Sequence, residues 1–223
     1  HAEYVVVSEN LCSRIDENTD IKEAAFTVLG SIALHGLRLS ETTLGSKVVV
    51  IGLGVIGQLV CRLAKAQGSE VTGIDPDPER SKNGDNFFTS IDEIEIKDVD
   101  TVIITAATSS NEPIELATKI ARNKAKIIVI GDIPLNISRN DFYYKELELV
   151  VSKSYGPGRY DKQYEALGND YPIEYVRWTE NRNFEAFTKL LSQNQIHLLD
   201  LVSEEIAFED APSVYEKFDD EIK

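Results

Sequence analysis

The stretch 47–75 constrains the fold of this chain more than any other part of it. An apolar run, 48–51, leads into Gly52, Gly54 and Gly57, which have the spacing GxGxxG. In a strand–turn–helix unit with this spacing, the first glycine permits a tight turn and the second lets a pyrophosphate approach the backbone. The third lets the helix pack closely on the sheet. The pattern therefore predicts a dinucleotide site, and the alternative is a doubly wound sheet whose glycines serve packing only.

The residues after the glycines complete this pattern. Val55, Ile56 and Leu63 share one face of a helix that Gly68 ends, and the next apolar run closes on Asp75. A helix N-terminus presents free N–H groups to phosphates, and an acid about 20 residues beyond the glycines binds a ribose 2′-hydroxyl. Because a carboxylate at that position repels a 2′-phosphate, we expect NAD(H) rather than NADP(H).

Composition narrows the classes of partner. The net charge of −15 argues against nucleic acid and anionic membranes as partners. No apolar run is long enough to span a bilayer, and no signal peptide is visible. The two cysteines, Cys12 and Cys61, form neither a CxxC pair nor a disulfide framework. This usage fits a reducing compartment, so a cytoplasmic protein is expected.

Strand and helix patterns alternate along most of the chain. Besides the unit at 47–75, apolar runs predict strands at 2–7, 86–90, 100–105, 126–131, 147–153 and 201–208. Helices are expected at 20–37, from Pro78 for a short length, at 111–122, 142–146 and 183–193, and after Pro212. Alternation with short links predicts an α/β fold, a Rossmann doubly wound parallel sheet with helices on both faces.

The segment 154–179 differs in composition from the rest. It holds five of the nine tyrosines and the only tryptophan, Trp178, together with Arg159 and Arg177. Such a composition is not that of a disordered segment, and long loops are uncommon unless they have a function. Two interpretations stay open: a substrate, lid or partner surface, and a long loop held by aromatic packing.

Taken together, these pieces resemble the medium-chain dehydrogenase/reductase superfamily, the zinc-type alcohol dehydrogenases and quinone oxidoreductases. AEYVVVSENL resembles the last strand of its GroES-like catalytic domain, and EAAFTVLGSIALHGL resembles its linker helix. The stretch LGSKVVVIGLGVIGQLVCRLAKAQGSEVTGIDPDPER resembles its cofactor half, and SEEIAFEDAPSVYEKF resembles its closing strand and helix. The resemblance implies a Rossmann domain flanked by partial strands and a helix of the catalytic domain.

A narrower resemblance concerns SYGPGRYDKQYEALGNDYPIEYVRWTENRNFEAF. It is similar to a subgroup fused to a second, Gfo/Idh/MocA-like oxidoreductase domain and associated with bacterial surface polysaccharide synthesis. This implies fused domains before and after the chain in a longer parent. It also implies that 1–22 ends a truncated GroES-like domain, that 23–180 is the NAD(P)-binding domain with 154–179 inserted, and that 181–223 returns to the catalytic domain.

Zinc is not expected, because the chain departs from the family at a metal ligand. Zinc alcohol dehydrogenases carry a cysteine in the linker helix after paired alanines, and that position here is Leu29. The three histidines, His1, His35 and His197, lack ligand spacing, and His35 is expected to be structural. The second Rossmann helix is also shorter than in the family.

The resemblance implies a set of cofactor contacts. The pyrophosphate would lie on the glycine turn, the adenine ribose at the acid and its neighbours, and the nicotinamide half at the loops after the fourth and fifth strands. The residues are Gly52, Gly54, Val55, Ile56, Gly57, Asp75, Pro76, Arg80, Thr105, Ala106, Ala107, Gly131 and Asp132.

The leading hypothesis is an NAD(H)-binding module of a zinc-independent dehydrogenase/reductase. It would support hydride transfer between nicotinamide and an alcohol or carbonyl substrate, which the family resemblance suggests is a sugar. A small-molecule substrate and a homodimer are the expected partners, no catalytic residue is named, and the chain alone is expected to turn over little. Two alternatives are a non-catalytic nucleotide-sensing regulatory module and a methyltransferase. The third glycine, Gly57, and the long helix after it disfavour the latter.

Overall fold

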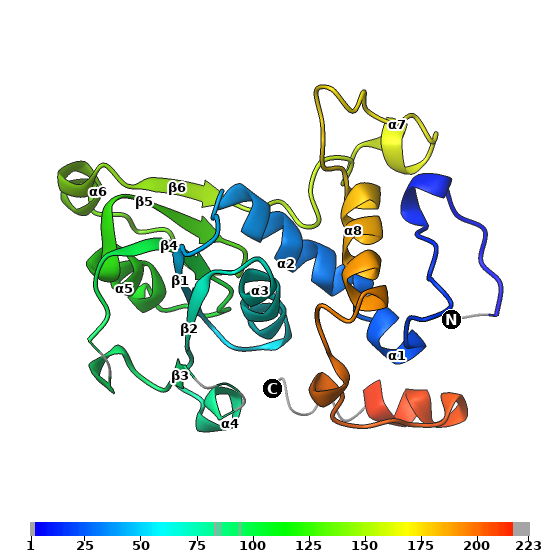
Figure 1. Cartoon of the computed structure of the whole chain (residues 1–223), viewed down its shortest axis with the longest axis horizontal. Coiled ribbons are helices and arrows are strands. Elements are labelled where there is room, and N and C mark those ends of the chain that lie inside the picture. The colour runs from blue at the N-terminus through cyan, green and yellow to red at the C-terminus, as the bar shows by residue number, and fades with distance from the viewer. Residues whose placement is uncertain (1–2, 83, 85, 94, 216–223) are drawn as a thin grey trace.

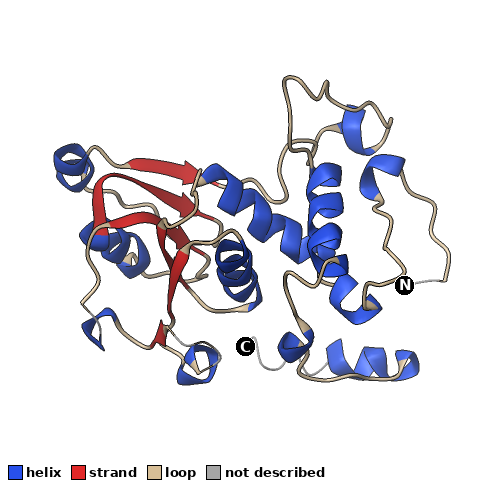
Figure 2. Cartoon of the chain, in the orientation of Figure 1, coloured by secondary structure: helices blue, strands red, loops and turns tan. Residues whose placement is uncertain are grey.

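The middle of the chain, from β1 to β6, folds into a six-stranded, all-parallel sheet (Figures 1 and 2). The computed structural model describes residues 3–82, 84, 86–93 and 95–215. In this part the strand order is β3-β2-β1-β4-β5-β6. The first three strands are added towards one edge of the sheet and the last three towards the other, so the strand order reverses between β1 and β4. The strands are β1 Lys47–Ile51, β2 Glu70–Ile74, β3 Phe87–Phe88, β4 Val99–Ile104, β5 Ala121–Val129 and β6 Glu148–Val151.

Helices connect the strands and extend the molecule beyond the sheet. They are α1 Ile21–Ala24, α2 Thr27–Leu39, α3 Val55–Ala66, α4 Pro78–Ser81, α5 Glu112–Ile120, α6 Arg139–Lys145, α7 Lys162–Glu165 and α8 Glu180–Ser192. Short 3₁₀ turns lie at Glu9–Leu11, Ile91–Glu93, Leu199–Leu201 and Phe208–Asp210. Residues 211–215 are helical as well. In this described part, no helix is long and apolar enough to cross a membrane.

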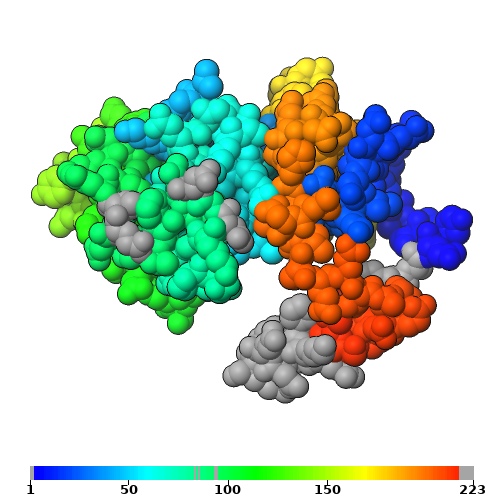
Figure 3. All heavy atoms as spheres, turned by 60° about the horizontal axis from the view of Figure 1, so that its bottom comes forward, coloured from blue at the N-terminus to red at the C-terminus, as the bar shows by residue number. Residues whose placement is uncertain are grey.

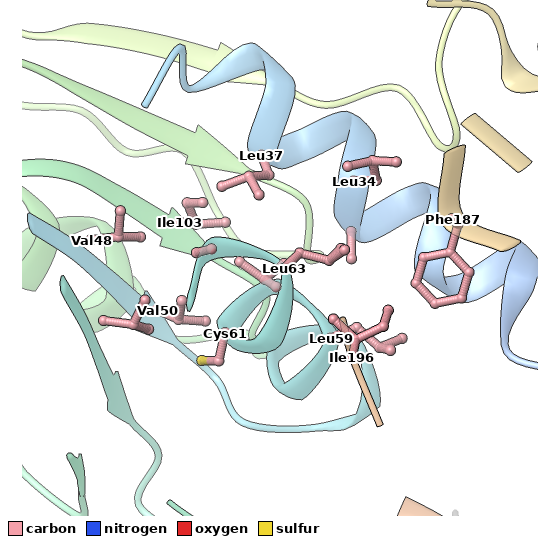
Figure 4. Packing of buried hydrophobic residues seen from close by; sticks show 14 of the residues in the cluster. Leu34, Leu37, Val48, Val50, Leu59, Cys61, Leu63, Ile103, Phe187 and Ile196 are labelled. Carbon is pink, nitrogen blue, oxygen red and sulfur yellow. The ribbon is translucent and has the colours of Figure 1, made fainter. Parts of the chain in front are cut away.

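Alternation along each strand divides the core into two layers. Val48 and Val50 face α2 and α3, whereas Val49 and Ile51 face the layer that contains α5. The first layer continues past the sheet to Phe187 of α8 (Figure 4). Because parallel strands are buried on both faces, their nearly continuous apolar runs were a reliable signal in the sequence.

A second group of segments gathers around α8, away from the sheet (Figure 1). Asn181 donates a hydrogen bond to the Cys12 carbonyl at 2.7 Å, and Ser13 lies 3.4 Å from Thr188, hydroxyl to hydroxyl. Figure 3 shows these N-terminal residues, in blue, beside the orange α8 region and on the opposite side of it from the green sheet half. The molecule thus has a sheet end and a helical end joined by α2.

The segment 154–179 is held by aromatic packing, as one of the two interpretations expected. Tyr164 is fully buried and donates a hydrogen bond to Thr179 Oγ1 at 2.9 Å. Its ring stacks on Tyr171, with centroids 5.5 Å apart, and Tyr155 packs against Phe184. These contacts order the loop.

Four sequence predictions were wrong. The single helix expected over 20–37 is two helices, α1 and α2, with a turn at residues 25–26 between them. Residues 3–7 and 201–208 contain no strand, and Val6 is fully exposed. An extended apolar run becomes a strand only when a neighbouring strand pairs with it, and within the described residues neither run has one. The helix predicted to reach Arg122 ends at Ile120, because β5 already begins at Ala121. Residues 1–2, 83, 85, 94 and 216–223 lie outside the described part. The start of the first predicted strand and the end of the last predicted helix fall among these residues.

Candidate cofactor-binding site

The turn between β1 and α3 is built on glycines that leave no room for side chains. Gly52 has φ +97°, a left-handed conformation, and a Cβ added there would lie 2.6 Å from the Ala106 amide nitrogen. A Cβ at Gly57 would overlap the Gly52 carbonyl oxygen. The Thr105 hydroxyl donates to that same carbonyl at 2.6 Å. The first and third glycines therefore serve close packing of strand, turn and helix.

Gly54 is different, because a Cβ added there would meet no protein atom within 4 Å. Its φ of −62° is also open to any residue. Gly54 is the N-cap of α3 and provides no side-chain hydrogen bond, whereas Asp77 caps α4 and Thr179 caps α8. No N-cap side chain binds the first N–H groups of α3, and Gly54, Val55 and Ile56 at this helix start line a cleft.

Asp75 lies directly after β2 and is 3% exposed. Its carboxylate accepts hydrogen bonds from the backbone N–H groups of Leu53, at 2.6 Å, and Asp77, at 2.9 Å. Arg80 Nη1 lies 3.6 Å from Oδ2. Each carboxylate oxygen has about two lone-pair sites, so Asp75 is fixed in orientation by the backbone and retains capacity to accept another donor.

A cleft of about 1010 Å³ opens at the carboxyl ends of β1, β2 and β4. This is the edge at which the strand order reverses, where open α/β sheets bind ligands. Eleven of the thirteen predicted contact residues line it: Gly52, Gly54, Val55, Ile56, Gly57, Asp75, Pro76, Arg80, Thr105, Ala106 and Ala107. The structure thus brings together, in one cavity, residues from Gly52 to Ala107 that belong to three separate strand ends.

Gly131 and Asp132 do not line this cleft. A Cβ at Gly131 would overlap the Ala106 carbonyl oxygen, and the Asp132 carbonyl accepts a hydrogen bond from the Thr108 N–H at 3.0 Å. The loop after β5 therefore packs against the loop after β4 and hydrogen-bonds to it. A direct cofactor contact by these two residues stays a prediction.

Sequence reasoning missed one wall of the cleft. Thr89, Ser90 and Ile91 follow the end of β3, and a second group lies along α5. The α5 group is Glu112, Pro113, Glu115, Leu116 and Lys119. The first group follows the rule that ligands lie at strand ends. In the second group, Glu112, Glu115, Leu116 and Lys119 have the spacing of one helix face. This signal was present in the sequence, but the face combines charged and apolar residues and so did not stand out as a binding surface.

The linker-helix residues also have defined places. Leu29 lines the cleft, so the position that carries a metal ligand in zinc alcohol dehydrogenases is at the site. His35 is buried instead, and burial first and Arg38 second lower its pKa to about 4. Cys61 is buried in the core, where burial raises the pKa of its thiol to about 12. No cluster of three metal-ligating side chains occurs among the residues that the structure describes.

The fold and the cleft together define an NAD-binding Rossmann domain of the kind found in dehydrogenases. Residues 19–141 match the family model described as "D-isomer specific 2-hydroxyacid dehydrogenase, NAD binding domain". Since the match covers more than half of the chain, the chain belongs to this family of NAD-binding domains.

Among curated proteins, the chain is similar to 2-dehydro-3-deoxy-L-galactonate 5-dehydrogenase of Pseudoalteromonas atlantica, with 26% identity over 178 residues. That alignment covers 73% of this chain and 49% of the relative. The chain spans no more than about half the length of the curated relatives it matches first.

Solved structures share the fold. Galactitol-1-phosphate dehydrogenase of Escherichia coli gives a TM-score of 0.73 at 21% identity, over 94% of this chain and 60% of that one. A candidate zinc-binding dehydrogenase of Sinorhizobium meliloti, bound to NADP, gives 0.69 at 20% identity over 90% and 57%. All three of these proteins are named as dehydrogenases, and one of them is named as zinc-binding.

Proposed function

We propose that this chain is the NAD(H)-binding module of a zinc-independent medium-chain dehydrogenase/reductase that acts on the alcohol or carbonyl carbon of a sugar or polyol. The observation that carries the proposal is Gly54. Its missing side chain serves no packing contact and leaves open the space in front of the uncapped N-terminus of α3. A pyrophosphate fits such a place in both charge and size.

The residues of the cleft then have separate roles. The N–H groups at the start of α3 would bind the phosphates, and Asp75 would accept a hydrogen bond from the adenine ribose. Thr105 holds the glycine turn in place through the Gly52 carbonyl. A bound nicotinamide supplies or accepts the hydride, and the protein contributes binding and orientation.

Gly54→Ala tests this function directly. The added methyl group meets no protein atom, so the fold should be retained, while the methyl group obstructs the phosphates. We expect NADH affinity, measured by isothermal titration calorimetry, to fall at least about 10-fold, or about 1.4 kcal/mol. An unchanged affinity in a folded variant, or no NADH binding by the unaltered chain, would overturn the proposal.

A preference for NAD(H) over NADP(H) follows from Asp75. We expect the chain to bind NADH more tightly than NADPH, because the buried carboxylate would face the extra phosphate. Asp75→Asn should narrow this difference, whereas Asp77→Asn, which removes an equal charge next door and keeps a good N-cap residue, should not. Equal affinities for the two cofactors in the unaltered chain would contradict the preference, and circular dichroism would show whether Asp75→Asn remains folded.

Zinc independence is supported by Leu29, which lies in the cleft and has no ligand atom. The test is the metal content and dehydrogenase activity of the parent protein after chelation, with activity retained as the expected result. Loss of activity that zinc restores would contradict it.

The narrower part of the proposal has three elements. The substrate is a sugar of surface polysaccharide synthesis, the parent protein carries a fused second oxidoreductase domain, and the protein is cytoplasmic. Its support is the resemblance of the stretch 154–187 alone. Sequencing the parent gene on both sides of the chain tests the fusion without any assumption about the cofactor.

A further inference from the structure

Two arginines contact the single tryptophan of the chain. The guanidinium carbon of Arg38, on α2, lies 3.3 Å from the ring centroid of Trp178, and that of Arg177 lies 3.8 Å from it. Cation–π contacts at this range attract each guanidinium to the ring. The ring thus holds two positive charges close together, where helix α2 meets the segment 154–179.

Neither guanidinium is neutralised by an acid. Arg38 Nε donates to the neutral Asn183 Oδ1 at 2.9 Å, and across the described ranges no carboxylate forms an ion pair with Arg38 or Arg177. The remaining N–H groups of both side chains have no protein acceptor there. By contrast, five other arginines are paired with carboxylates: Arg62, Arg80, Arg122, Arg159 and Arg182.

Arg14 and Arg139 also form no ion pair among the described residues, but only Arg38 and Arg177 share one aromatic ring. Arg38 is also partly desolvated. Its burial, and then the nearby Arg177, lower its pKa to about 10, so it stays charged at neutral pH while experiencing repulsion. The neighbouring His35 is neutral at that pH because burial and Arg38 lower its pKa to about 4. Two uncompensated charges with free donors favour a negatively charged ligand.

We propose that Arg38 and Arg177, positioned by Trp178, bind a small oxyanion, the phosphate or carboxylate group of a metabolite. Guanidinium forks match the paired oxygens of both groups and bind them bidentately. None of these three residues lines the cofactor cleft, so the site is distinct from that of the dinucleotide. The inference does not depend on the dehydrogenase proposal.

Trp178 is the only tryptophan in the chain, so its fluorescence reports on this site alone when tyrosine is not excited. The experiment titrates the cofactor-free 223-residue chain with inorganic phosphate and, in a second arm, with acetate. Sodium chloride at matched ionic strength is the control for screening. We expect a saturable change in Trp178 emission with at least one of the two oxyanions and none with chloride.

Two variants of equal charge make the test specific. Arg177→Gln removes one of the two guanidinium groups of the site, and Arg177 is exposed. Arg139→Gln removes a guanidinium on α6, whose carbon lies 4.7 Å from the ring centroid of Tyr143. We expect the apparent dissociation constant to rise at least about 10-fold in Arg177→Gln and to be unchanged in Arg139→Gln. A response to phosphate alone or acetate alone identifies the preferred group and supports the site.

The proposal is overturned if neither oxyanion changes the emission beyond chloride, or if Arg177→Gln, shown by circular dichroism to be folded, responds as the unaltered chain does. Equal weakening in both variants would also overturn it, because it would show a general charge effect. NADH titration of the same samples separates this outcome from failure of the cofactor site.

Discussion

Gly54 and Gly57, three positions apart, show how one motif combines two physical requirements. A Cβ at Gly57 would overlap the Gly52 carbonyl, whereas one at Gly54 would enter open space. We expect Gly57→Ala to lower the free energy of unfolding by about 1–3 kcal/mol, the usual cost of overpacking. Gly54→Ala, the matched control, should change it by less than about 0.5 kcal/mol. Urea unfolding measures both, and equal losses would show that the two glycines serve packing alike.

We expect the stability of the molecule to depend on pH through Glu180. Its side chain is fully buried, and within the described residues neither carboxylate oxygen has a hydrogen-bond partner. Burial, followed by the nearby Glu165, raises its pKa from 4.5 to about 7, while Arg159 acts in the opposite direction. The folded state therefore holds this proton more tightly than the unfolded state, and the stabilisation declines as the pH rises from 4.5 through about 7.

Urea unfolding at pH about 5.5 and about 8 checks this prediction. The unaltered chain should lose on the order of 2 kcal/mol from this group between the two, and Glu180→Gln should remove that part of the slope. Glu174→Gln, at an exposed site, is the control and should keep the full slope. An identical slope in Glu180→Gln would contradict the assignment.

At the scale of elements, Lys145 of α6 caps the end of a different helix. Its Nζ donates to the carbonyls of Thr118, Lys119 and Ala121 at 2.7, 3.0 and 2.8 Å, at the C-terminus of α5. Those carbonyls have no partner within the helix, and a cation there also complements the helix dipole. Lys145→Met should therefore lower the free energy of unfolding by about 1–3 kcal/mol.

The matched control is Lys124→Met, which removes an exposed lysine whose ion pair with Glu146 is 3.5 Å long. Exposed pairs contribute about 0–1 kcal/mol, so its unfolding midpoint should barely move. A loss in Lys124→Met equal to that in Lys145→Met would show a general charge effect instead of capping.

The elements also show what a sequence can reveal. The sheet was predictable because a buried parallel strand needs a continuous apolar run. The end of α3 before Gly68 and the start of α4 at Pro78 were predictable because they follow local backbone rules. The runs 3–7 and 201–208 were misjudged because pairing depends on a partner elsewhere. For the same reason, the wall of the site on α5 and the contact between Arg38 and Trp178 escaped prediction, since both depend on how distant elements pack.

At the scale of the whole molecule, Phe187 joins the helical end to the sheet end. Its fully buried ring lies where a Cβ of Gly30 would stand, so α8 packs against the backbone of α2. The same core layer continues to the sheet (Figure 4). We therefore expect the two ends to unfold together, and Phe187→Ala to cost about 3–5 kcal/mol.

Urea unfolding followed by Trp178 fluorescence, at the helical end, and by far-ultraviolet circular dichroism, over the whole chain, tests this. Coincident transitions are the expected result, with Tyr144→Ala, at an exposed site, as the neutral control. Separate transitions in the unaltered chain would show two independent units.

The uncapped start of α3 has a consequence for the lifetime of the chain. A helix end whose N–H groups face an open cleft is completed only by what enters that cleft, so the dinucleotide would act as the missing cap. By linkage, a ligand at a hundred times its dissociation constant adds about 2.7 kcal/mol to the folded state. The supply of cofactor in the cell would then set how often the chain opens to proteases, and starvation for the dinucleotide would shorten its survival.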